Sequence, residues 1–285
     1  MSPAARAWHT SAMDPYVRKN RELWDEWTEI NVRSAFYDVE GFKRTPSPLD
    51  PLVREGLGEL AGRSVLHLQC HFGMDTLRIA REAREVVGVD FSGKAIAFAR
   101  GLAAELGLAA RFVETDLYEL PAVLDGEFDR VFTSYGAIEW LPDLDRWGQI
   151  IARYLRPGGV FFIADGHPTM WMFDGEAADG LHVRYPYFRP PVPLEIPPTV
   201  GNYADPTAAV TKTVYSWPHA ISEVVMALVR AGLQIEDFRE HAHAAWQPFP
   251  FCVEEEVDGE RRWRMPPDRP QIPLMFSLRA RKPAA

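Results

Sequence analysis

The sequence predicts an α/β fold, in which a mostly parallel sheet is covered by helices on both faces. Between residues 62 and 165, short apolar runs of strand length alternate with helical patterns, as in a sheet built from βαβ units. Polar and acidic residues follow these strands where they end, and ligands of parallel sheets bind outside the carboxyl ends of the strands. We therefore expect a ligand site at that edge of the sheet.

Composition excludes several classes of partner. The 285 residues carry a net charge of −9 and only two cysteines, Cys70 and Cys252. This charge argues against nucleic acid as a partner, and two cysteines suggest neither a disulfide framework nor a cysteine-based zinc site. The N-terminus has no apolar signal core, and no run of about 18 apolar residues is present. We expect a cytoplasmic protein with one large domain, binding neither membrane nor nucleic acid.

Residues 1–60 are predicted to form an N-terminal helical cap. The Asp14-Pro15 pair starts a helix, because an N-cap acceptor precedes proline at the first helical position. One face of this helix carries Tyr16, Leu23, Trp24, Trp27 and Ile30. That face can simply pack on the core, or it can cover a ligand. On the second interpretation, Tyr16, Trp24 and Tyr37 contact the substrate.

Residues 64–90 have the pattern of strand, turn, helix and strand. The run from Ser64 to Leu68 breaks at Gly73 into a helical pattern, and a second run, from Val86 to Val89, ends on Asp90. Such a turn lets a ligand approach backbone at a helix N-terminus, and a carboxylate after the second strand accepts hydrogen bonds from ribose hydroxyls. With one glycine, however, the turn matches the dinucleotide fingerprint G-x-G-x-x-G poorly.

The same turn resembles that of the class I S-adenosylmethionine-dependent methyltransferases, whose motif is an acidic residue, a spacer and G-x-G-x-G. His67 stands at the acidic position, Gln69 and His71 stand at the first two glycines, and Gly73 stands at the third. The form HLQCHFGMDTL is similar to that of a bacterial subfamily. The resemblance implies S-adenosylmethionine as the cofactor, with the side chains at 67, 69 and 71 near its methionine end.

Helices and strands continue to alternate up to residue 165, so residues 61–165 are predicted to form the cofactor-binding core. The expected elements are a helix from Ser92 to about Leu106, a strand from Arg111 to Thr115, a strand from Phe128 to Ser134, a helix from Asp143 to Arg156 and a strand from Val160 to Ala164. The run from Phe128 to Pro168 resembles the fourth and fifth motifs of the same family.

The resemblance implies that acids at two strand ends hold the nucleoside. Asp90 holds the ribose hydroxyls, with Phe91 beside the adenine. Asp116 receives the adenine amino group, with the Leu117 backbone adjacent, although a capping role competes because strand-to-helix turns often carry Asp. The residues predicted to bind the cofactor are His67, Gln69, Cys70, His71, Gly73, Asp90, Phe91, Asp116, Leu117, Ser134 and Tyr135.

Residues 166–217 interrupt the alternation of helices and strands. Dense proline prevents a regular helix or a central strand, and dense aromatic residues argue against a disordered linker. We expect an ordered lid or small antiparallel insertion over the strand ends, where substrates are selected. An oligomer contact, such as that of a homodimer, is the alternative. Trp140 and Trp171 are also predicted to contact the substrate.

Residues 218–285 are predicted to complete the core. A helix starts at Pro218 and runs to about Leu233, and strands follow at Gln234–His241 and Leu274–Arg279, separated by a proline-interrupted, charged stretch. In the resemblance, a final antiparallel strand pair gives a Rossmann-like sheet of seven strands. The N-terminal helical cap and the inserted lid are additions to this sheet.

Two histidines are candidate general bases. His167 follows the fifth predicted strand, and His219 stands at a helix start whose dipole favours neutral imidazole, the form that accepts a proton. His71 lies in the cofactor turn, where contact with the cofactor is expected. A hydrogen-bonded structural role is the alternative for each histidine. No two histidines have the i, i+4 spacing of metal ligands on a predicted helix, so no metal is predicted.

Together these patterns predict a S-adenosylmethionine-dependent methyltransferase acting at an oxygen or nitrogen of a small, aromatic or apolar molecule. The candidate histidine bases favour oxygen. One alternative is a NAD-dependent oxidoreductase, because both folds place an acid after the second strand, but that class needs pyrophosphate-binding glycines. The other alternative is a non-catalytic protein that binds S-adenosylmethionine.

Overall fold

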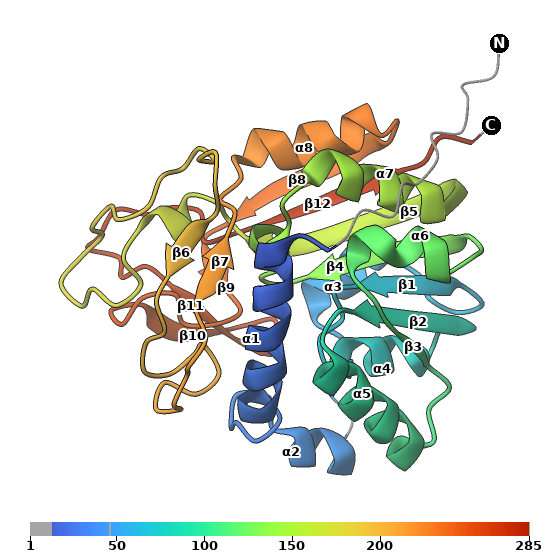
Figure 1. The fold of residues 1–285 in the computed structure, drawn as a ribbon, viewed down its shortest axis with the longest axis horizontal. Helices are drawn as coiled ribbons and strands as arrows, with labels where there is room; N and C mark the ends of the chain where they lie inside the picture. Colours follow the sequence, from blue (N-terminus) through green and yellow to red (C-terminus); the bar gives the residue numbers. More distant parts are fainter. Residues whose placement is uncertain (1–12, 46, 285) are drawn as a thin grey trace.

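A seven-stranded sheet forms the centre of the structure, a computed structural model that describes residues 13–45 and 47–284 (Figure 1). The strand order is β3-β2-β1-β4-β5-β12-β8. The strands are β1 (Ser64–Leu68), β2 (Glu85–Asp90), β3 (Arg111–Glu114), β4 (Phe128–Ser134), β5 (Leu155–Gly166), β8 (Gln234–His241) and β12 (Met275–Arg281). Six of these strands run in the same direction, and β12 runs opposite to them, antiparallel to both β5 and β8. The predicted Rossmann-like fold class is confirmed.

Helices cover both faces of this sheet, because its central strands are apolar on both sides. One face packs on α6 (Leu120–Val123), α7 (Leu144–Tyr154) and α8 (Ile221–Arg230), and the other on α3 (Pro51–Leu57), α4 (Met74–Ala80) and α5 (Gly93–Leu106). In β1 the side chains alternate between the two faces, with Leu66 in the first core cluster and Val65 in the second. All five residues of β1 are buried.

Two N-terminal helices, α1 (Pro15–Asn31) and α2 (Val39–Arg44), precede the sheet in the chain, and Val39 and Phe42 of α2 belong to the same core cluster as residues of α4 and α5. The side chain of Asp14 caps α1 by accepting a hydrogen bond from the amide of Tyr16 at 2.8 Å, as the Asp14-Pro15 pair predicts. Figure 1 shows α1, in dark blue, standing between the main sheet and the smaller strands. It contacts both α5 and β7 (Val214–Ser216).

The chain between β5 and α8 forms the expected ordered insertion. Its two short strands, β6 (Leu194–Ile196) and β7, pair in antiparallel fashion. The described residues also form three 3₁₀ turns, η1 (Leu117–Glu119), η2 (Ile138–Trp140) and η3 (Met170–Met172). The domain limits given above remain predictions.

A second small sheet was not predicted. It has the order β10-β11-β9 and consists of β9 (His243–Ala244), β10 (Val253–Val257) and β11 (Glu260–Arg264). Of these strands, β10 and β11 lie in the proline-interrupted, charged stretch described above. Asp258 and Gly259 both have positive φ, 54° and 78°, as a tight two-residue hairpin turn requires. An Asp-Gly pair between two strand-length segments is therefore the sequence feature that could have revealed this hairpin.

Within the described residues, no helix combines the length and the apolar character needed to cross a membrane.

Candidate functional site

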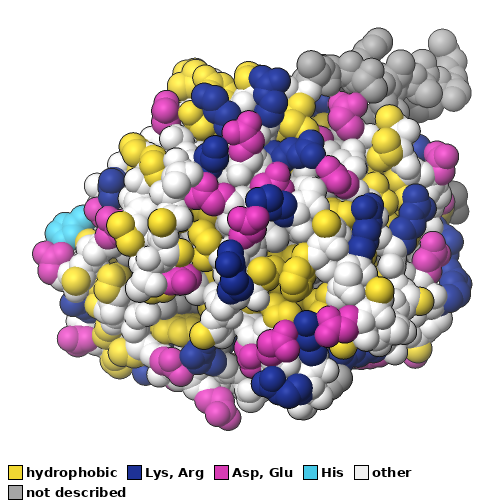
Figure 2. Space-filling model, turned by 60° about the horizontal axis from the view of Figure 1, so that its bottom comes forward, with side chains coloured by type: hydrophobic (Ala, Val, Ile, Leu, Met, Phe, Trp, Pro, Cys, Tyr) yellow, Lys and Arg dark blue, Asp and Glu magenta, His cyan; other side chains and the backbone are white. Residues whose placement is uncertain are grey.

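A cavity of about 600 Å³, here called the large cavity, lies at the carboxyl ends of β1 to β4. Its wall is formed by the turns after these strands, by α1, by the insertion and by the segment between β9 and β10. Figure 2 shows, on one face of the molecule, hydrophobic side chains gathered in a hollow with charged side chains around it. The predicted location of the site at this edge of the sheet thus coincides with a real cavity.

The turn after β1 has the backbone conformation that glycine favours at all three glycine positions of the family motif. Only the third of these positions, Gly73, is a glycine in this chain. Gln69, His71 and Gly73 all have positive φ, 53°, 53° and 83°. For a side chain other than glycine, this conformation costs on the order of 1 kcal/mol or more. Contacts offset the cost: the Gln69 amide donates to the Ala137 carbonyl at 2.9 Å, and the His71 ring packs 5.1 Å from that of Trp24.

Asp90, at the end of β2, opens into the large cavity while two backbone amides hold its carboxylate. The amide of His71 donates to Oδ2 at 2.8 Å, and the amide of Ser92 donates to Oδ1 at 2.9 Å. Burial raises the pKa of Asp90 to about 6. Because a carboxylate offers about four acceptor positions, Asp90 can still accept hydrogen bonds from two hydroxyls of a ligand.

Asp116, after β3, both caps a turn and lines the large cavity. Its Oδ1 accepts a hydrogen bond from the amide of Tyr118 at 2.7 Å, so the capping role considered above is present. In the described part of the chain no donor contacts Oδ2, and the residue lines the cavity. Burial raises the pKa of Asp116. One oxygen is therefore structural, and the other is available to a ligand amino group.

His67, at the acidic position of the family motif, is neutral. Its Nδ1 lies 2.9 Å from Oγ1 of Thr76, and its Nε2 lies 3.3 Å from Oγ of Ser134. Burial lowers the pKa of His67 to about 4 and that of His71 to about 3. Both rings therefore add no positive charge to the cavity at neutral pH.

The charged groups of the large cavity are mostly acidic. Its lining carboxyls are those of Asp50, Asp75, Asp90, Asp116, Glu139 and Glu260. The one cationic side chain among the described lining residues is Arg78, whose guanidinium is bound to Asp75 and to Oγ of Ser47. Aromatic rings surround the same space, with Trp24 5.2 Å from Trp140 and Trp27 6.0 Å from Tyr203. Such a wall favours a cationic ligand.

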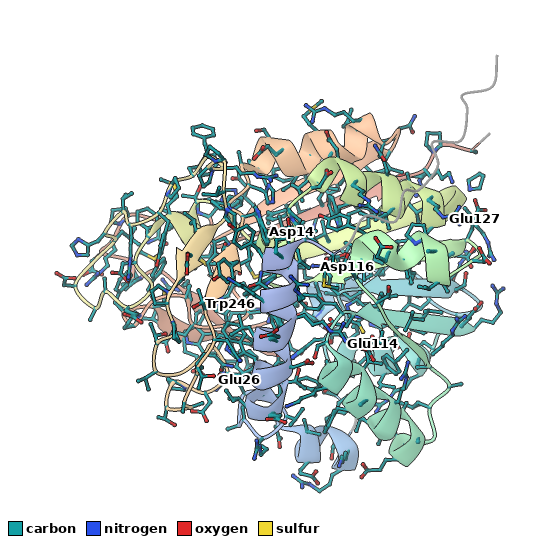
Figure 3. The ribbon with its side chains drawn as sticks, viewed as in Figure 1. Asp14, Glu26, Glu114, Asp116, Glu127 and Trp246 are labelled. Carbon is teal, nitrogen blue, oxygen red and sulfur yellow. The ribbon has the colours of Figure 1, made fainter. Side chains whose placement is uncertain are left out.

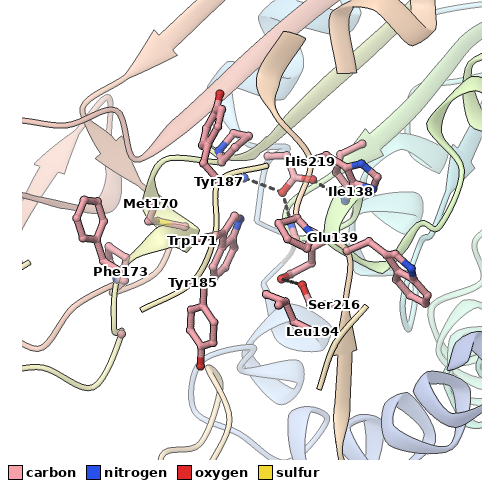
Figure 4. A pocket seen from close by; sticks show the side chains of 18 of the residues that line it. Ile138, Glu139, Met170, Trp171, Phe173, Tyr185, Tyr187, Leu194, Ser216 and His219 are labelled. Carbon is pink, nitrogen blue, oxygen red and sulfur yellow. Dashed lines mark hydrogen bonds between the residues drawn. The ribbon is translucent and has the colours of Figure 1, made fainter. Parts of the chain in front are cut away.

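A second cavity, of about 230 Å³ and here called the small cavity, adjoins the large one beneath the insertion (Figure 4). Gly136, Glu139, Trp171 and Pro248 line both cavities. Most of the small cavity's other walls are apolar or aromatic, and Figure 4 shows Trp171, Tyr185 and Tyr187 from the insertion among them. The two cavities therefore meet at four residues, of which Glu139 lies on η2 and Trp171 on η3.

Nearly all of the predicted cofactor residues line the large cavity. These are His67, Gln69, Cys70, His71, Asp90, Phe91, Asp116, Leu117, Ser134 and Tyr135. Gly73 does not line it, but supplies the bend and the N-cap position of α4. Their roles in binding remain predictions.

The residues predicted to contact a substrate or to act as bases are more scattered. Trp24, Tyr37, Trp140 and Trp171 line the large cavity. Tyr16 lines neither cavity and packs 5.1 Å from the ring of Tyr215. His219 lines the small cavity, where its Nε2 donates to the Leu141 carbonyl at 2.7 Å.

His167 lines neither cavity, although its neighbours Gly166 and Pro168 line the small one. Its Nδ1 accepts a hydrogen bond from the amide of Thr169 at 3.1 Å, and its Nε2 lies 3.0 Å from a carboxylate oxygen of Glu240 on β8. Burial lowers its pKa. This position matches the structural alternative considered for it, since its side chain contacts β8 and not the space at the strand ends.

Several lining residues were not singled out from the sequence. Tyr203 comes from the insertion, Trp246 from the segment after β9, and Glu139 from η2. Tyr203 reaches the site because its hydroxyl bonds to Tyr37 at 2.6 Å and accepts a hydrogen bond from Asn31 at 2.9 Å. Only the folded chain brings these distant segments together. In residues 13–45 and 47–284, no group of three metal-ligating side chains is arranged to hold a metal ion.

The chain is similar to methyltransferases in sequence. Residues 65–159 match a family model described as a methyltransferase domain. A ubiquinone biosynthesis O-methyltransferase of Cronobacter sakazakii is 32% identical over 157 residues, which cover 53% of this chain and 64% of that protein. An uncharacterised methyltransferase of Synechocystis is 36% identical over 143 residues, which cover 50% of this chain and 63% of that protein. The matched part thus spans less than two thirds of either relative.

The fold is shared with solved methyltransferase structures. A S-adenosylmethionine-dependent methyltransferase from Mesorhizobium loti superposes with a TM-score of 0.54 at 23% identity, covering 81% of this chain and 96% of that one. The expected resemblance to the class I family is confirmed for the fold and for the domain over residues 65–159.

Proposed function

We propose that this chain, which has the fold and the methyltransferase domain of the class I S-adenosylmethionine-dependent family, transfers a methyl group from S-adenosylmethionine to a small molecule. The observation that carries the proposal is the position of two acids. Asp90 ends β2, Asp116 follows β3, and both line one cavity beside the bend at residues 69–73.

In the proposed complex, Asp90 accepts hydrogen bonds from the ribose hydroxyls and Asp116 accepts one from the adenine amino group. The remaining acceptor positions on both carboxylates support these roles. The methionine end then extends along the turn that contains Gln69 and His71, toward Ser134 and Tyr135. The acidic, aromatic wall suits the sulfonium cation at that end.

Methyl transfer requires the acceptor atom to approach the methyl carbon in line with the carbon–sulfur bond. Holding two reactants in this geometry supplies much of the rate acceleration. The small cavity adjoins the large one through Gly136, Glu139 and Trp171, so an acceptor there would face the methyl group. We propose an aromatic or apolar acceptor, because the walls of the small cavity are mostly apolar.

Oxygen is the preferred acceptor atom in this proposal. Relatives of this chain include proteins named ubiquinone biosynthesis O-methyltransferases, which supports oxygen over nitrogen. The side chains of His219 and Glu139, both in the small cavity, could accept the proton that a hydroxyl loses. A cytoplasmic location and a homodimer stay predictions.

The NAD-dependent alternative is less well supported. That class needs glycines where the backbone approaches a pyrophosphate, and here the side chains of Gln69 and His71 fill the corresponding turn. Isothermal titration calorimetry distinguishes the proposed methyltransferase from a NAD-dependent oxidoreductase. We expect binding of S-adenosylmethionine and S-adenosylhomocysteine and no binding of NAD. Binding of NAD alone would overturn the proposal.

A further inference from the structure

We propose that Glu139 accepts the proton that the methyl acceptor loses, and that this acceptor is a neutral or cationic aromatic hydroxyl compound bound in the small cavity. This inference rests on the proposed function and deepens it. It concerns a residue that neither the cofactor motif nor the candidate histidines include. Glu139 lies between the two cavities.

Glu139 is one of the few residues that line both cavities. It lies on η2, directly after the β4 turn, and its carbonyl accepts a hydrogen bond from the amide of Trp217 at 2.8 Å. Oε2 of its side chain accepts one from Oγ of Ser216 at 3.3 Å, the dashed contact in Figure 4. The backbone is thus fixed, and the carboxyl group stands where a cofactor on one side would meet an acceptor on the other.

The other carboxyl group that lines the small cavity is already engaged. Asp165 accepts hydrogen bonds from four backbone amides, those of Gly136, Ala137, Ile138 and Gly166, at 2.5 to 3.0 Å. A carboxylate with four donors has no free acceptor position. Asp165 therefore holds the turn after β4 in place. Glu139, with one side-chain donor, is the carboxyl group that can still receive a proton from a ligand.

The protonation state of Glu139 depends on its surroundings and on whether the cofactor is bound. Burial and the charge of Asp165 raise the pKa of Glu139 to about 8, so the carboxyl is mostly protonated at neutral pH in the free protein. The other titratable side chains that line the small cavity are those of Asp165, Tyr185, Tyr187 and His219. Burial raises the pKa of Asp165 and lowers that of His219. A sulfonium cation arriving on the large-cavity side favours the carboxylate. Cofactor binding would therefore generate the base.

The chemical step balances without another reactant. The hydroxyl proton passes to the Glu139 carboxylate, and the freed oxygen lone pair forms the bond to the methyl carbon. The carbon–sulfur bond breaks, and its electron pair returns to sulfur, leaving S-adenosylhomocysteine as a neutral thioether. The products are the methyl ether, S-adenosylhomocysteine and protonated Glu139.

His219 is less suited to this role. Its Nε2 carries the hydrogen donated to the Leu141 carbonyl, because a carbonyl can only accept. Its Nδ1 lies 3.9 Å from Oε2 of Glu223. The residue lines only the small cavity, and it is absent from the junction where the methyl group would stand. We therefore assign His219 to holding the segment ahead of α8.

The walls of the small cavity indicate which acceptors it takes. Among the described residues that line it, none is Lys or Arg, whereas two are carboxylic acids. An acceptor that carries its own carboxylate would find no counter-charge there and would be repelled by the carboxylate of Asp165. A neutral ring, or one with an ammonium group, would pack against Trp171, Tyr185 and Leu194 without that cost.

The first test measures proton release and needs no acceptor. Calorimetric titration at pH 7, in two buffers with different enthalpies of ionisation, gives the number of protons released on binding. We expect S-adenosylmethionine to release up to about one proton more than S-adenosylhomocysteine, because only the sulfonium is charged. Any proton from Asp90 is common to both ligands and cancels in the difference. In Glu139→Gln the difference should vanish, while S-adenosylhomocysteine binds within about twofold of wild type.

Equal proton release by the two ligands in the wild type would overturn the role of Glu139 and leave the proposed function intact. Failure of both ligands to bind would instead overturn the proposed function. Persistence of the difference in Glu139→Gln would assign the proton to another group and also overturn the inference.

The second test addresses the acceptor with three matched phenols: 4-ethylphenol is neutral, tyramine is cationic and 4-hydroxyphenylacetate is anionic. With S-adenosylhomocysteine bound, we expect the first two to bind at least about tenfold more tightly than the third. Leu194→Trp, which fills the small cavity, should abolish binding of 4-ethylphenol. Val192→Trp is the matched control, since Val192 lies two residues away, is 62% exposed and does not line the cavity.

Tighter binding of the anionic phenol, or unchanged binding in Leu194→Trp, would contradict the assignment of the small cavity. For the phenol methylated fastest, Glu139→Gln should lower kcat about 100-fold with KM within about threefold, and should remove the rise of kcat with pH. An equal loss in kcat at every pH would indicate a structural role and overturn the inference.

Discussion

Asp90 joins two roles in one side chain. It holds the turn after β1 through the amide of His71 and starts the next segment through the amide of Ser92, and it faces the large cavity. Glu114 is the acid that ends the neighbouring strand β3, and it pairs in register with Asp90 of β2. Glu114 lies outside the cavity wall and forms an ion pair with Arg21 at 2.6 Å. The two acids therefore differ in access to a ligand, although both end a strand. Figure 3 labels Glu114 together with Asp116, the acid that follows the same strand.

Asp90→Ala should weaken binding of S-adenosylmethionine by more than about 1.4 kcal/mol, or tenfold, because a charged acceptor for two hydroxyls is removed. Glu114→Ala should change it by less than about threefold. Calorimetry measures both, and urea unfolding checks that each variant is folded. If the dissociation constant of Asp90→Ala equals that of the wild type, Asp90 does not belong to the cofactor site.

At the scale of elements, α1 is joined to the insertion by polar side chains that are themselves buried. Asn20 is fully buried, and its amide donates to the Tyr215 carbonyl at 2.6 Å while its oxygen accepts from the Tyr215 amide at 3.0 Å. These bonds give the outer edge of β7 a partner that no strand supplies. Because Trp24 and Trp27 sit on the same helix, this junction also positions part of the cavity wall.

Asn20→Ala should lower the free energy of unfolding by about 2 kcal/mol, because it leaves a buried backbone amide and carbonyl without partners. Arg18→Ala, at an exposed position on the same helix, should change it by less than about 0.5 kcal/mol. Urea titration followed by tryptophan fluorescence measures the two variants. Similar losses in both would show that the hydrogen bonds to Tyr215 contribute little.

Across the whole molecule, buried ionisable groups make stability depend on pH in both directions. The pKa of Glu139 is raised from an ordinary value of 4.5 to about 8, so between these values the folded protein keeps a proton that the unfolded chain has lost. Rising pH therefore favours unfolding through this group. The pKa values of His67 and His71 are lowered to about 4 and about 3, so below about pH 6.5 falling pH favours unfolding.

The free energy of unfolding of the free protein should therefore peak near pH 6.5 and fall toward pH 8, by at most about 1.4 kcal/mol per pH unit. Glu139→Gln should flatten the decline above pH 6.5, since the amide does not titrate. Glu59→Gln, at an exposed position, should keep it. Urea unfolding at half-unit steps of pH gives the curves, and an unchanged slope in Glu139→Gln would rule out Glu139 as its source.

Local features of the sequence were sufficient to predict the central sheet and the edge at which the large cavity lies. Strand-length apolar runs and the acids that follow them are local features, so β4 and β8 begin and end where they were predicted, and Asp90 and Asp116 do line one cavity. The capping residues Asp14 and Ser92 are local as well, because a cap contacts amides within three residues.

The remaining walls of the two cavities come from segments that only the folded chain brings together. Tyr203, Trp246 and Glu139 reach the cavities through contacts between segments far apart in the chain, which no periodicity encodes. The tertiary structure also directs the side chain of His167 toward β8, where its Nε2 lies 3.0 Å from Oε1 of Glu240. The burial of Glu139 depends on all of these segments together. This burial raises the pKa of Glu139, which no feature of the sequence around it predicts.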